Sequence, residues 1–200
     1  MNYFKIVDAG NFQEYNKQFL DYYHMNQSNF IPKNSFWNPL RPECLGHCLD
    51  NNPNFASGIN KFGKVKEIAI LFLHKDSSTL HIDHQSGLNR GVKARLNIPI
   101  LNCEGSYTSF FELDEKTFNQ SKFSKGLTRF WDDELRNELT PVSSVELIQP
   151  TILRTSSPHS VFCVLCKFPR ISLTVSFQND VVHLLENDTE NISSSGLNIS

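Results

Sequence analysis

The chain has 200 residues, 39% of them hydrophobic, which is enough to bury a sizeable core within one domain. Nineteen basic and 21 acidic side chains give a formal charge of −2, and this balance lacks the basic excess typical of a nucleic-acid-binding surface. Five cysteines, an odd number, lack the spacing of a disulfide framework, and no apolar run approaches the length of a membrane span. We therefore expect a cytoplasmic protein with no nucleic-acid or membrane partner.

The first 42 residues predict a short strand, a helix and a loop. Residues 3–7 have the composition of a strand, and aromatic residues then recur at helical spacing at Tyr15, Phe19 and Tyr22. We expect this stripe to pack on the outside of a sheet. Residues 26–42 are rich in Asn, Ser and Pro, which is typical of a loop.

Residues 42–49 are compatible with a short helix that contains Cys44, His47 and Cys48. A zinc site here would need a second pair of ligands at suitable spacing, and none is evident in the sequence, so zinc is disfavoured. The sequence Asn-Asn-Pro at 51–53 is expected to end this element.

Short strands separated by turn residues account for most of the chain between residues 67 and 177. We expect them at 67–73, 79–83, 93–101, 107–113, 142–148, 151–154, from 158–161 onwards and at 170–177. Residues 85–91 contain two glycines and predict a mobile loop over the functional site. We expect a loop with a helical turn at 114–125, a short amphipathic helix at 128–139, and a flexible C-terminal tail at 179–200.

His81 and Asp83 lie two residues apart in an expected strand, so their side chains share one face. With His159 they would supply two imidazoles and one carboxylate, the ligand set of non-haem iron(II) oxygenases. Arg170 and Ser172 also share a strand face, and a guanidinium beside a hydroxyl suits an anchored carboxylate. These residues predict a metal site with a carboxylate anchor further along the barrel.

The order of these motifs resembles that of the iron(II)/2-oxoglutarate-dependent oxygenases, and of their small bacterial and phage-type members in particular. The resemblance covers roughly positions 65–178 and includes Arg95-Leu96-Asn97 between the first histidine and the second. It implies a mainly β fold, a double-stranded β-helix (jelly roll, cupin-like) with a few flanking α-helices. Residues 1–178 would form that single domain.

The resemblance further implies an Fe(II)- and 2-oxoglutarate-dependent dioxygenase that consumes O2 and releases succinate and CO2. It would hydroxylate a small molecule or an amino-acid side chain. Arg170 and Ser172 would bind the far carboxylate of 2-oxoglutarate, and Asn97 is a candidate to hydrogen-bond the cosubstrate or a ligand. The catalytic metal ligands would be His81, Asp83 and His159. A non-catalytic 2-oxoglutarate- or ligand-binding module on the same fold is the alternative.

Other residues in the sequence compete for these roles. His84 follows Asp83 but points to the opposite face if the strand continues. Asp132 and Asp133 are typical of a solvated helix start rather than of an iron site. Cys163 and Cys166 form a CxxC motif, but in a strand this spacing places the thiols on opposite faces, so we expect buried thiols that behave as small apolar groups.

Overall fold

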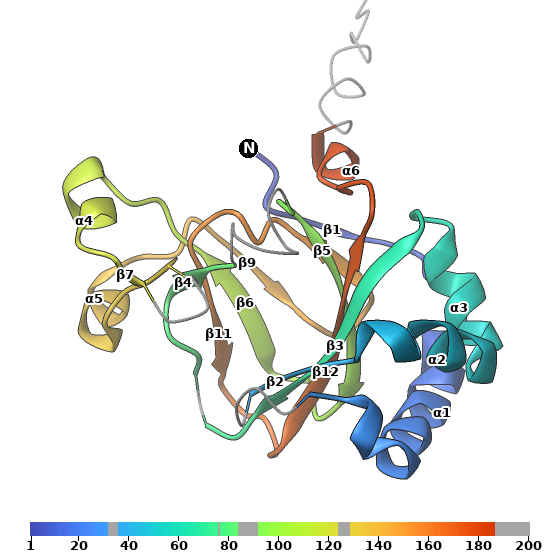
Figure 1. Ribbon diagram of the computed structural model, residues 1–200. Helices are drawn as coiled ribbons and strands as arrows, with labels where there is room; N and C mark the ends of the chain where they lie inside the picture. The colour runs from blue at the N-terminus through green and yellow to red at the C-terminus, as the bar shows by residue number, and fades with distance from the viewer. Residues whose placement is uncertain (32–35, 76, 84–91, 124–128, 187–200) are drawn as a thin grey trace, which may run out of the picture.

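The computed structural model describes residues 1–31, 36–75, 77–83, 92–123 and 129–186. Two six-stranded sheets, antiparallel throughout, form the centre of the molecule (Figure 1). The first sheet consists of β1 (Phe4–Ile6), β2 (Trp37–Pro39), β3 (Val65–Leu73), β5 (Arg95–Leu101), β10 (Thr151–Leu153) and β12 (Arg170–Phe177). The second sheet consists of β4 (His81–Ile82), β6 (Ser106–Phe110), β7 (Lys122–Phe123), β8 (Arg129–Phe130), β9 (Ser143–Glu146) and β11 (His159–Cys163).

From β3 to β6, and again from β9 to β12, strands that follow one another in the chain alternate between the two sheets. β3 and β5 lie in the first sheet, β4 and β6 in the second, and β9 to β12 repeat the alternation. The spatial orders are β1-β10-β5-β12-β3-β2 and β7-β8-β4-β11-β6-β9. This winding is that of a jelly roll, so the predicted mainly β, double-stranded β-helix with flanking helices is confirmed.

Three helices cover the outer face of the first sheet: α1 (Phe12–Met25), α2 (Leu45–Asn51) and α3 (Pro53–Asn60). The aromatic stripe predicted for the first of them is buried, and it joins one hydrophobic cluster with the outward-facing residues of the central strands. Those outward residues include Ile68, Ile70, Leu96, Ile98, Leu173 and Val175. Because strand residues alternate between faces, their neighbours Glu67, Arg95, Asn97, Ser172 and Thr174 face the interior between the sheets.

Two short helices, α4 (Glu115–Asn119) and α5 (Asp133–Glu138), lie on the other side of the molecule, against the second sheet (Figure 1). A second hydrophobic cluster is buried there and consists of Leu80, Ile82, Phe111 and Trp131. The Trp131 indole donates a hydrogen bond to the carbonyl of Thr117 (2.9 Å), which ties α4 to the sheet. Helices therefore flank both sheets rather than one.

Three segments differ from the sequence-based expectation. The expected loop at 26–42 contains a 3-10 turn, η1 (Gln27–Asn29), and the edge strand β2, which pairs with β3. A second 3-10 turn, η2 (Pro42–Cys44), precedes α2. The Asn-Asn-Pro sequence at 51–53, which was expected to end that helix, also begins α3. Pro53 occupies the first position of α3, where a missing N–H costs no hydrogen bond. The helix expected at 128–139 is β8 followed by α5.

The segment expected to be a flexible tail begins as packed structure. It contains a short helix, α6 (His183–Glu186). The side chains of Val181 and Leu185 are buried in the same hydrophobic cluster as the aromatic stripe of α1 and the outward-facing residues of the first sheet. The Asp180 carboxylate accepts hydrogen bonds from the backbone N–H groups of Lys93 and Val182. The folded part of the chain thus reaches at least Glu186. Residues 187–200 and the expected loop at 85–91 lie outside the described residues.

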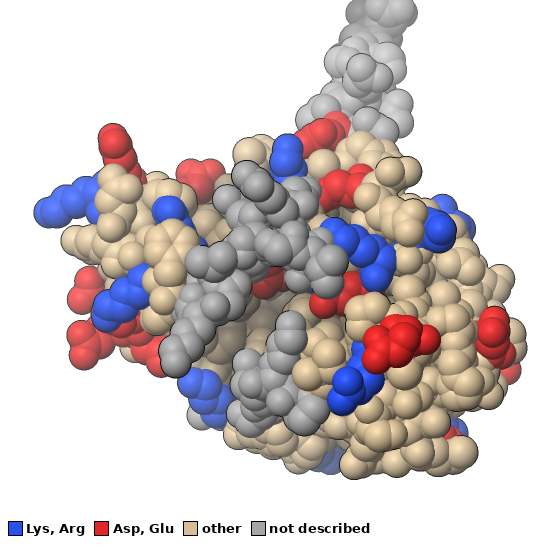
Figure 2. All heavy atoms as spheres, viewed as in Figure 1, with Lys and Arg blue, Asp and Glu red and all other residues tan. Residues whose placement is uncertain are grey.

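Basic and acidic side chains are interspersed over the face shown in Figure 2. Among the described helices, none combines the length and the apolar composition that crossing a membrane requires.

Candidate metal centre

The pairing of β4 with β11 brings the two predicted histidines together. His81 and His159 are direct cross-strand partners, and their ring centroids are 4.3 Å apart. Residues opposite each other in antiparallel strands have Cβ atoms only about 5 Å apart, so two imidazoles at these positions necessarily share one site. The register therefore explains how residues 78 positions apart form one pair.

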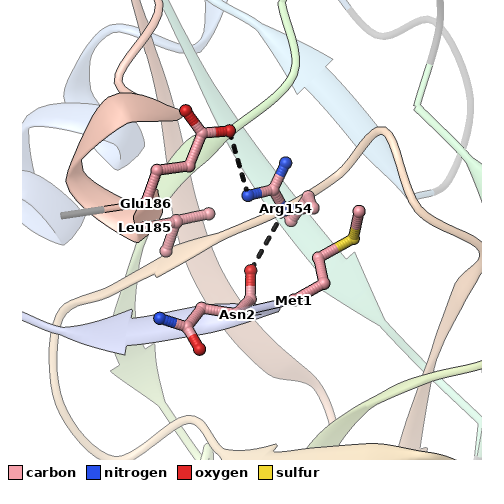
Figure 3. A pocket seen from close by; sticks show the side chains of 5 residues that line it. All are labelled: Met1, Asn2, Arg154, Leu185 and Glu186. Atoms are coloured by element: carbon pink, nitrogen blue, oxygen red, sulfur yellow. Dashed lines mark hydrogen bonds and ion pairs between the residues drawn. The ribbon is translucent and has the colours of Figure 1, made fainter. Parts of the chain in front are cut away.

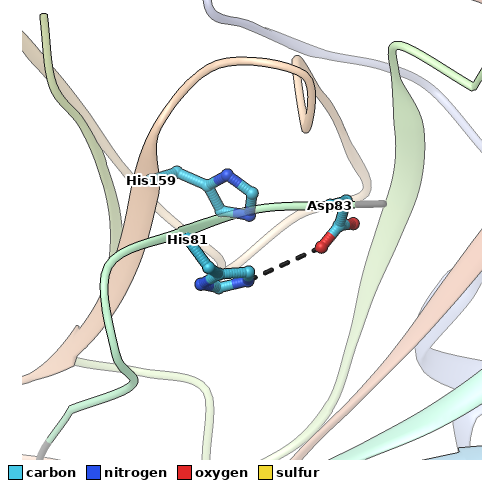
Figure 4. A group of neighbouring side chains, drawn as sticks. All are labelled: His81, Asp83 and His159. Carbon is cyan, nitrogen blue, oxygen red and sulfur yellow. Dashed lines mark ion pairs between the residues drawn. The ribbon is translucent and has the colours of Figure 1, made fainter. Parts of the chain in front are cut away.

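Asp83 follows β4 directly and points to the same face as His81, as the two-residue spacing predicts (Figure 4). One carboxylate oxygen, Oδ1, lies 3.5 Å from His81 Nε2. One potential ligand atom from each of His81, Asp83 and His159 falls within a group that spans no more than 4.8 Å. In the part of the chain that the structure describes, this is the one group of three such residues that could hold a metal ion.

Both imidazoles are oriented by backbone carbonyls two residues earlier in the chain. His81 Nδ1 lies 2.7 Å from the Thr79 carbonyl oxygen, and His159 Nδ1 lies 2.9 Å from that of Ser157. Since a carbonyl oxygen only accepts, each Nδ1 must carry the proton and donate it. The Nε2 lone pair of each ring is then left for a metal ion, as in protein sites where the second ring nitrogen fixes the tautomer of a histidine ligand.

The charges of the site favour a ligating carboxylate and at least one neutral imidazole. Burial alone would raise the pKa of Asp83, but contacts with His81 and the charge of Arg95 hold that pKa well below its usual range. Burial and the neighbouring His81 lower the pKa of His159 to about 4. Burial lowers the pKa of His81, but its contacts with Asp83 outweigh this and raise it overall. A cation bound at Nε2 of His81 would compete with protonation of that atom.

Arg95 and Glu67 also belong to this site, and the sequence analysis did not assign them a role. Arg95 Nε lies 3.3 Å from Asp83 Oδ2, and Arg95 Nη1 lies 3.4 Å from Glu67 Oε2. The sequence did contain a signal for this contact: Arg95 is a charged residue at an inward position of a largely apolar strand. A buried arginine of this kind requires acidic partners.

The predicted carboxylate anchor lies on β12, and its two members contact each other. Arg170 is 2% exposed, and its Nη1 donates to Ser172 Oγ at 2.8 Å. Its Nε donates to Ser106 Oγ at 3.1 Å, which connects β12 in the first sheet with β6 in the second. The guanidinium therefore lies between the sheets, as the sequence interpretation requires. Ser106 was not foreseen.

Asn97 occupies an inward position between the two ends of this arrangement. It is 6% exposed and pairs in register with Thr174 of β12 and Thr151 of β10. Its side-chain amide donates a long hydrogen bond of 3.5 Å to the Arg95 carbonyl. A role in binding a cosubstrate remains a prediction.

The competing residues are placed elsewhere. Asp132 is exposed and pairs with Lys122 (2.8 Å), and Asp133 is exposed on α5. Cys48 packs in the core beneath the first sheet, where burial raises the pKa of its thiol to about 12. His84 lies outside the described residues.

The two thiols of the CxxC motif lie closer together than a continuous strand allows. β11 ends at Cys163, and the chain bends before Cys166, so the prediction that the thiols occupy opposite faces is wrong. Burial and a hydrogen bond with Cys163 raise the pKa of Cys166, which disfavours a reactive thiolate.

The strand that carries His81 is supported from its outer face. Leu80 and Ile82, on either side of the histidine, are buried beneath Trp131. Arg136 of α5 donates to the hydroxyl of Ser77 (2.7 Å) and to the carbonyl of Ser78 (2.9 Å), just before β4. The packing of Trp131 and the hydrogen bonds of Arg136 together stabilise β4, which is only two residues long.

Comparisons with known proteins agree with this architecture. No protein-family model matches the sequence, and a search of curated proteins found no relative. Among solved structures, the non-heme alpha ketoglutarate dependent epimerase SnoN from nogalamycin biosynthesis matches with a TM-score of 0.53 and 13% identity, over 87% of this chain and 77% of that one. SnoN in complex with Fe3+, alpha ketoglutarate and nogalamycin RO matches with a TM-score of 0.55 and 10% identity, over 98% and 88%. Apo HygX from Streptomyces hygroscopicus reaches a TM-score of 0.49 at 12% identity, over 87% and 80%.

At these identities the likeness to SnoN establishes the fold. The chain shares the double-stranded β-helix architecture of SnoN, so the fold that the motif resemblance implies is confirmed. What the site does follows from its own residues.

Proposed function

We propose that the protein is an Fe(II)- and 2-oxoglutarate-dependent dioxygenase that hydroxylates a small molecule or an amino-acid side chain. The observation that carries this proposal is the convergence of His81, Asp83 and His159 on the inner face of the second sheet. Two imidazoles with free Nε2 atoms and one carboxylate form the donor set that holds non-haem iron while leaving coordination positions open. SnoN, whose fold the chain shares, is described as alpha ketoglutarate dependent.

The environment of Arg170 suits the cosubstrate. Its guanidinium is buried, and among the described residues its hydrogen-bond partners are two serine hydroxyls rather than a carboxylate. A buried cation without an anionic partner is costly, and a dicarboxylic acid reaching from the metal would supply that partner. The Ser172 hydroxyl, whose oxygen accepts from Arg170, would donate a hydrogen bond to that carboxylate, and Asn97 would contact the cosubstrate or a ligand further toward the metal.

When bound, iron and 2-oxoglutarate supply oxidation by dioxygen, with succinate and CO2 as co-products. The chain contributes three ligands at fixed positions, a cation for the far carboxylate, and two sheets that limit access of water to the site. The five cysteines are free thiols, which accords with a cytoplasmic location.

An anaerobic titration tests the site. Metal-free protein receives Fe(II) and then 2-oxoglutarate, and the visible metal-to-ligand charge-transfer band of the chelate is recorded. We expect the band in wild type, its loss in His81→Ala, and a much higher 2-oxoglutarate requirement in Arg170→Ala. His47→Ala and Arg154→Ala serve as matched controls, because both residues hydrogen-bond away from the site.

Turnover is tested separately. Succinate release under air, measured with panels of free amino acids and small metabolites, distinguishes an oxygenase from a module that only binds. A band without succinate at any substrate would favour the binding module. Absence of the band in folded wild-type protein would refute the proposed function.

A further inference from the structure

Arg95 is a buried cation beside the metal ligand Asp83. It begins β5, its side chain is 3% exposed, and it lies between two carboxylates that come from different sheets. Asp83 Oδ2 is 3.3 Å from its Nε, and Glu67 Oε2 is 3.4 Å from its Nη1. The Trp37 ring centroid lies 5.3 Å from the guanidinium carbon, close enough for a cation–π contact. The guanidinium is thus held on three sides.

The two oxygens of Asp83 have different neighbours. Oδ1 lies toward the imidazoles, 3.5 Å from His81 Nε2, whereas Oδ2 lies toward Arg95. Arg95 Nε is buried and has no partner with hydrogen-bond geometry among the described residues, and Asp83 Oδ2 is an acceptor within reach. Leaving a buried N–H without an acceptor is unfavourable, so a small rotation of the carboxylate that completes this bond would be favourable.

We propose that Arg95 positions Asp83 as a one-oxygen metal ligand, with Glu67 and Trp37 holding the guanidinium in place. This inference rests on the proposed function, because it assumes that the group of His81, Asp83 and His159 binds a metal ion. A carboxylate free to rotate can bind a cation through one oxygen or both. With Oδ2 hydrogen-bonded to Arg95, only Oδ1 faces the metal, and the coordination position that Oδ2 would occupy stays open.

A purely structural role for Arg95 makes a different prediction. Its removal would then lower stability and leave the metal site as it is. A positioning role predicts a changed coordination signature and weaker metal binding in protein that is still folded. Loss of a group that hydrogen-bonds a metal ligand typically lowers metal affinity by about 10–100-fold.

Co(II) is a suitable probe because its visible ligand-field bands report coordination number and geometry without turnover. Metal-free wild type, His81→Ala, Arg95→Met, Arg95→Lys and Arg154→Met are titrated with Co(II) alone, and folding is checked by circular dichroism. Arg154 is a matched control: it too is a nearly buried arginine, paired with Glu186 (3.4 Å) and with the Asn2 carbonyl (3.0 Å) at a pocket of about 290 Å³ (Figure 3).

We expect Arg154→Met to bind Co(II) with the affinity and spectrum of wild type. Arg95→Met should bind it about 10–100-fold more weakly, with shifted bands. Arg95→Lys keeps the charge without the planar fork, so it should recover part of the affinity and still show altered bands. If Arg95→Met does not fold, Arg95→Lys decides the question.

The outcomes separate the two proposals. Wild-type affinity and an unchanged spectrum in a folded Arg95 variant would overturn the positioning role and leave the metal centre intact. Failure of the wild-type protein to bind Co(II) in a His81-dependent way would overturn the metal centre, and the role of Arg95 with it.

Discussion

Replacing Arg170 with methionine should weaken cosubstrate binding strongly without destabilising the ligand-free protein. The guanidinium is 2% exposed, and its described partners are the hydroxyls of Ser106 and Ser172. Desolvating an ion costs several kcal/mol. Hydrogen bonds to a charged group contribute only about 1.5–3 kcal/mol each. The two effects nearly cancel, and a buried methionine side chain adds about 1.5–3 kcal/mol of apolar burial.

We therefore expect the free energy of unfolding of metal-free Arg170→Met to be unchanged, or higher by up to about 2 kcal/mol. For a chain of this size each kcal/mol corresponds to about 2–4 °C in Tm. The loss of two charge-assisted bonds to the cosubstrate, about 3–6 kcal/mol in total, should raise the Kd for 2-oxoglutarate by about 100- to 10,000-fold.

Urea unfolding of the metal-free protein measures the first quantity, and anaerobic calorimetry of the Mn(II)-loaded protein with 2-oxoglutarate measures the second. Arg154→Met is the control, because its guanidinium has a carboxylate partner in Glu186 and its loss should destabilise. A fall of more than about 2 kcal/mol in Arg170→Met would show that the buried cation is stabilising in the absence of a ligand, contrary to this reasoning.

Three further outcomes are expected. A Cβ on Gly58 would collide with the carbonyl oxygen of Ala9, so Gly58→Ala should lower the free energy of unfolding by about 1–3 kcal/mol. A Cβ on Gly46 would meet nothing within 4 Å, so Gly46→Ala should raise the free energy of unfolding by up to about 1 kcal/mol. Thermal melts compare the two variants. In the unfolded chain His159 becomes protonated below about pH 6.5, whereas in the folded metal-free protein it stays neutral down to about pH 4. As the pH falls from 6.5 to 4, the free energy of unfolding should therefore decrease by about 3 kcal/mol. The raised pKa of His81 changes stability with pH in the opposite direction. The contribution of His159 is therefore isolated as the difference in the free energy of unfolding between wild type and His159→Asn, measured by urea titration at several pH values. A difference that does not change with pH would contradict this prediction. Mn(II) at a hundred times its Kd should stabilise wild type by about 2.7 kcal/mol and leave His81→Ala unchanged in the same melts; equal stabilisation of both would place the ion elsewhere.

Much of the fold could be predicted from the sequence because its strands keep a clear period of two. The run at 170–177 alternates polar and apolar residues and forms β12, with one face in the core and the other between the sheets. β2 was missed because three residues ending in a proline carry no period, and its strand character comes from pairing with β3. The strand β8 was assigned to a helix because Phe130 and Trp131 sit among charged residues at spacings compatible with either structure.

The site was predictable to the extent that its residues follow strand periodicity. His81 and Asp83 share a face because they are two apart, and the structure brings His159 opposite them through the register of β4 and β11. No such rule connects Arg95 with Glu67, which lies two strands away in the first sheet, or with Asp83, whose contact with Arg95 crosses to the second sheet. Contacts of this kind depend on how the two sheets are packed, which the pattern within a strand does not encode.

The hydrogen bonds from the two histidines to main-chain carbonyls make the orientation of the rings insensitive to side-chain variation around them. Thr79 and Ser157 contribute only their carbonyl groups, so other residues at these positions can hold the rings equally well. Sequences could therefore diverge there without losing the ligand geometry, and comparison of side chains alone would not reveal what aligns the imidazoles. The feature to look for in distant proteins of this fold is the path of the backbone two residues before each histidine.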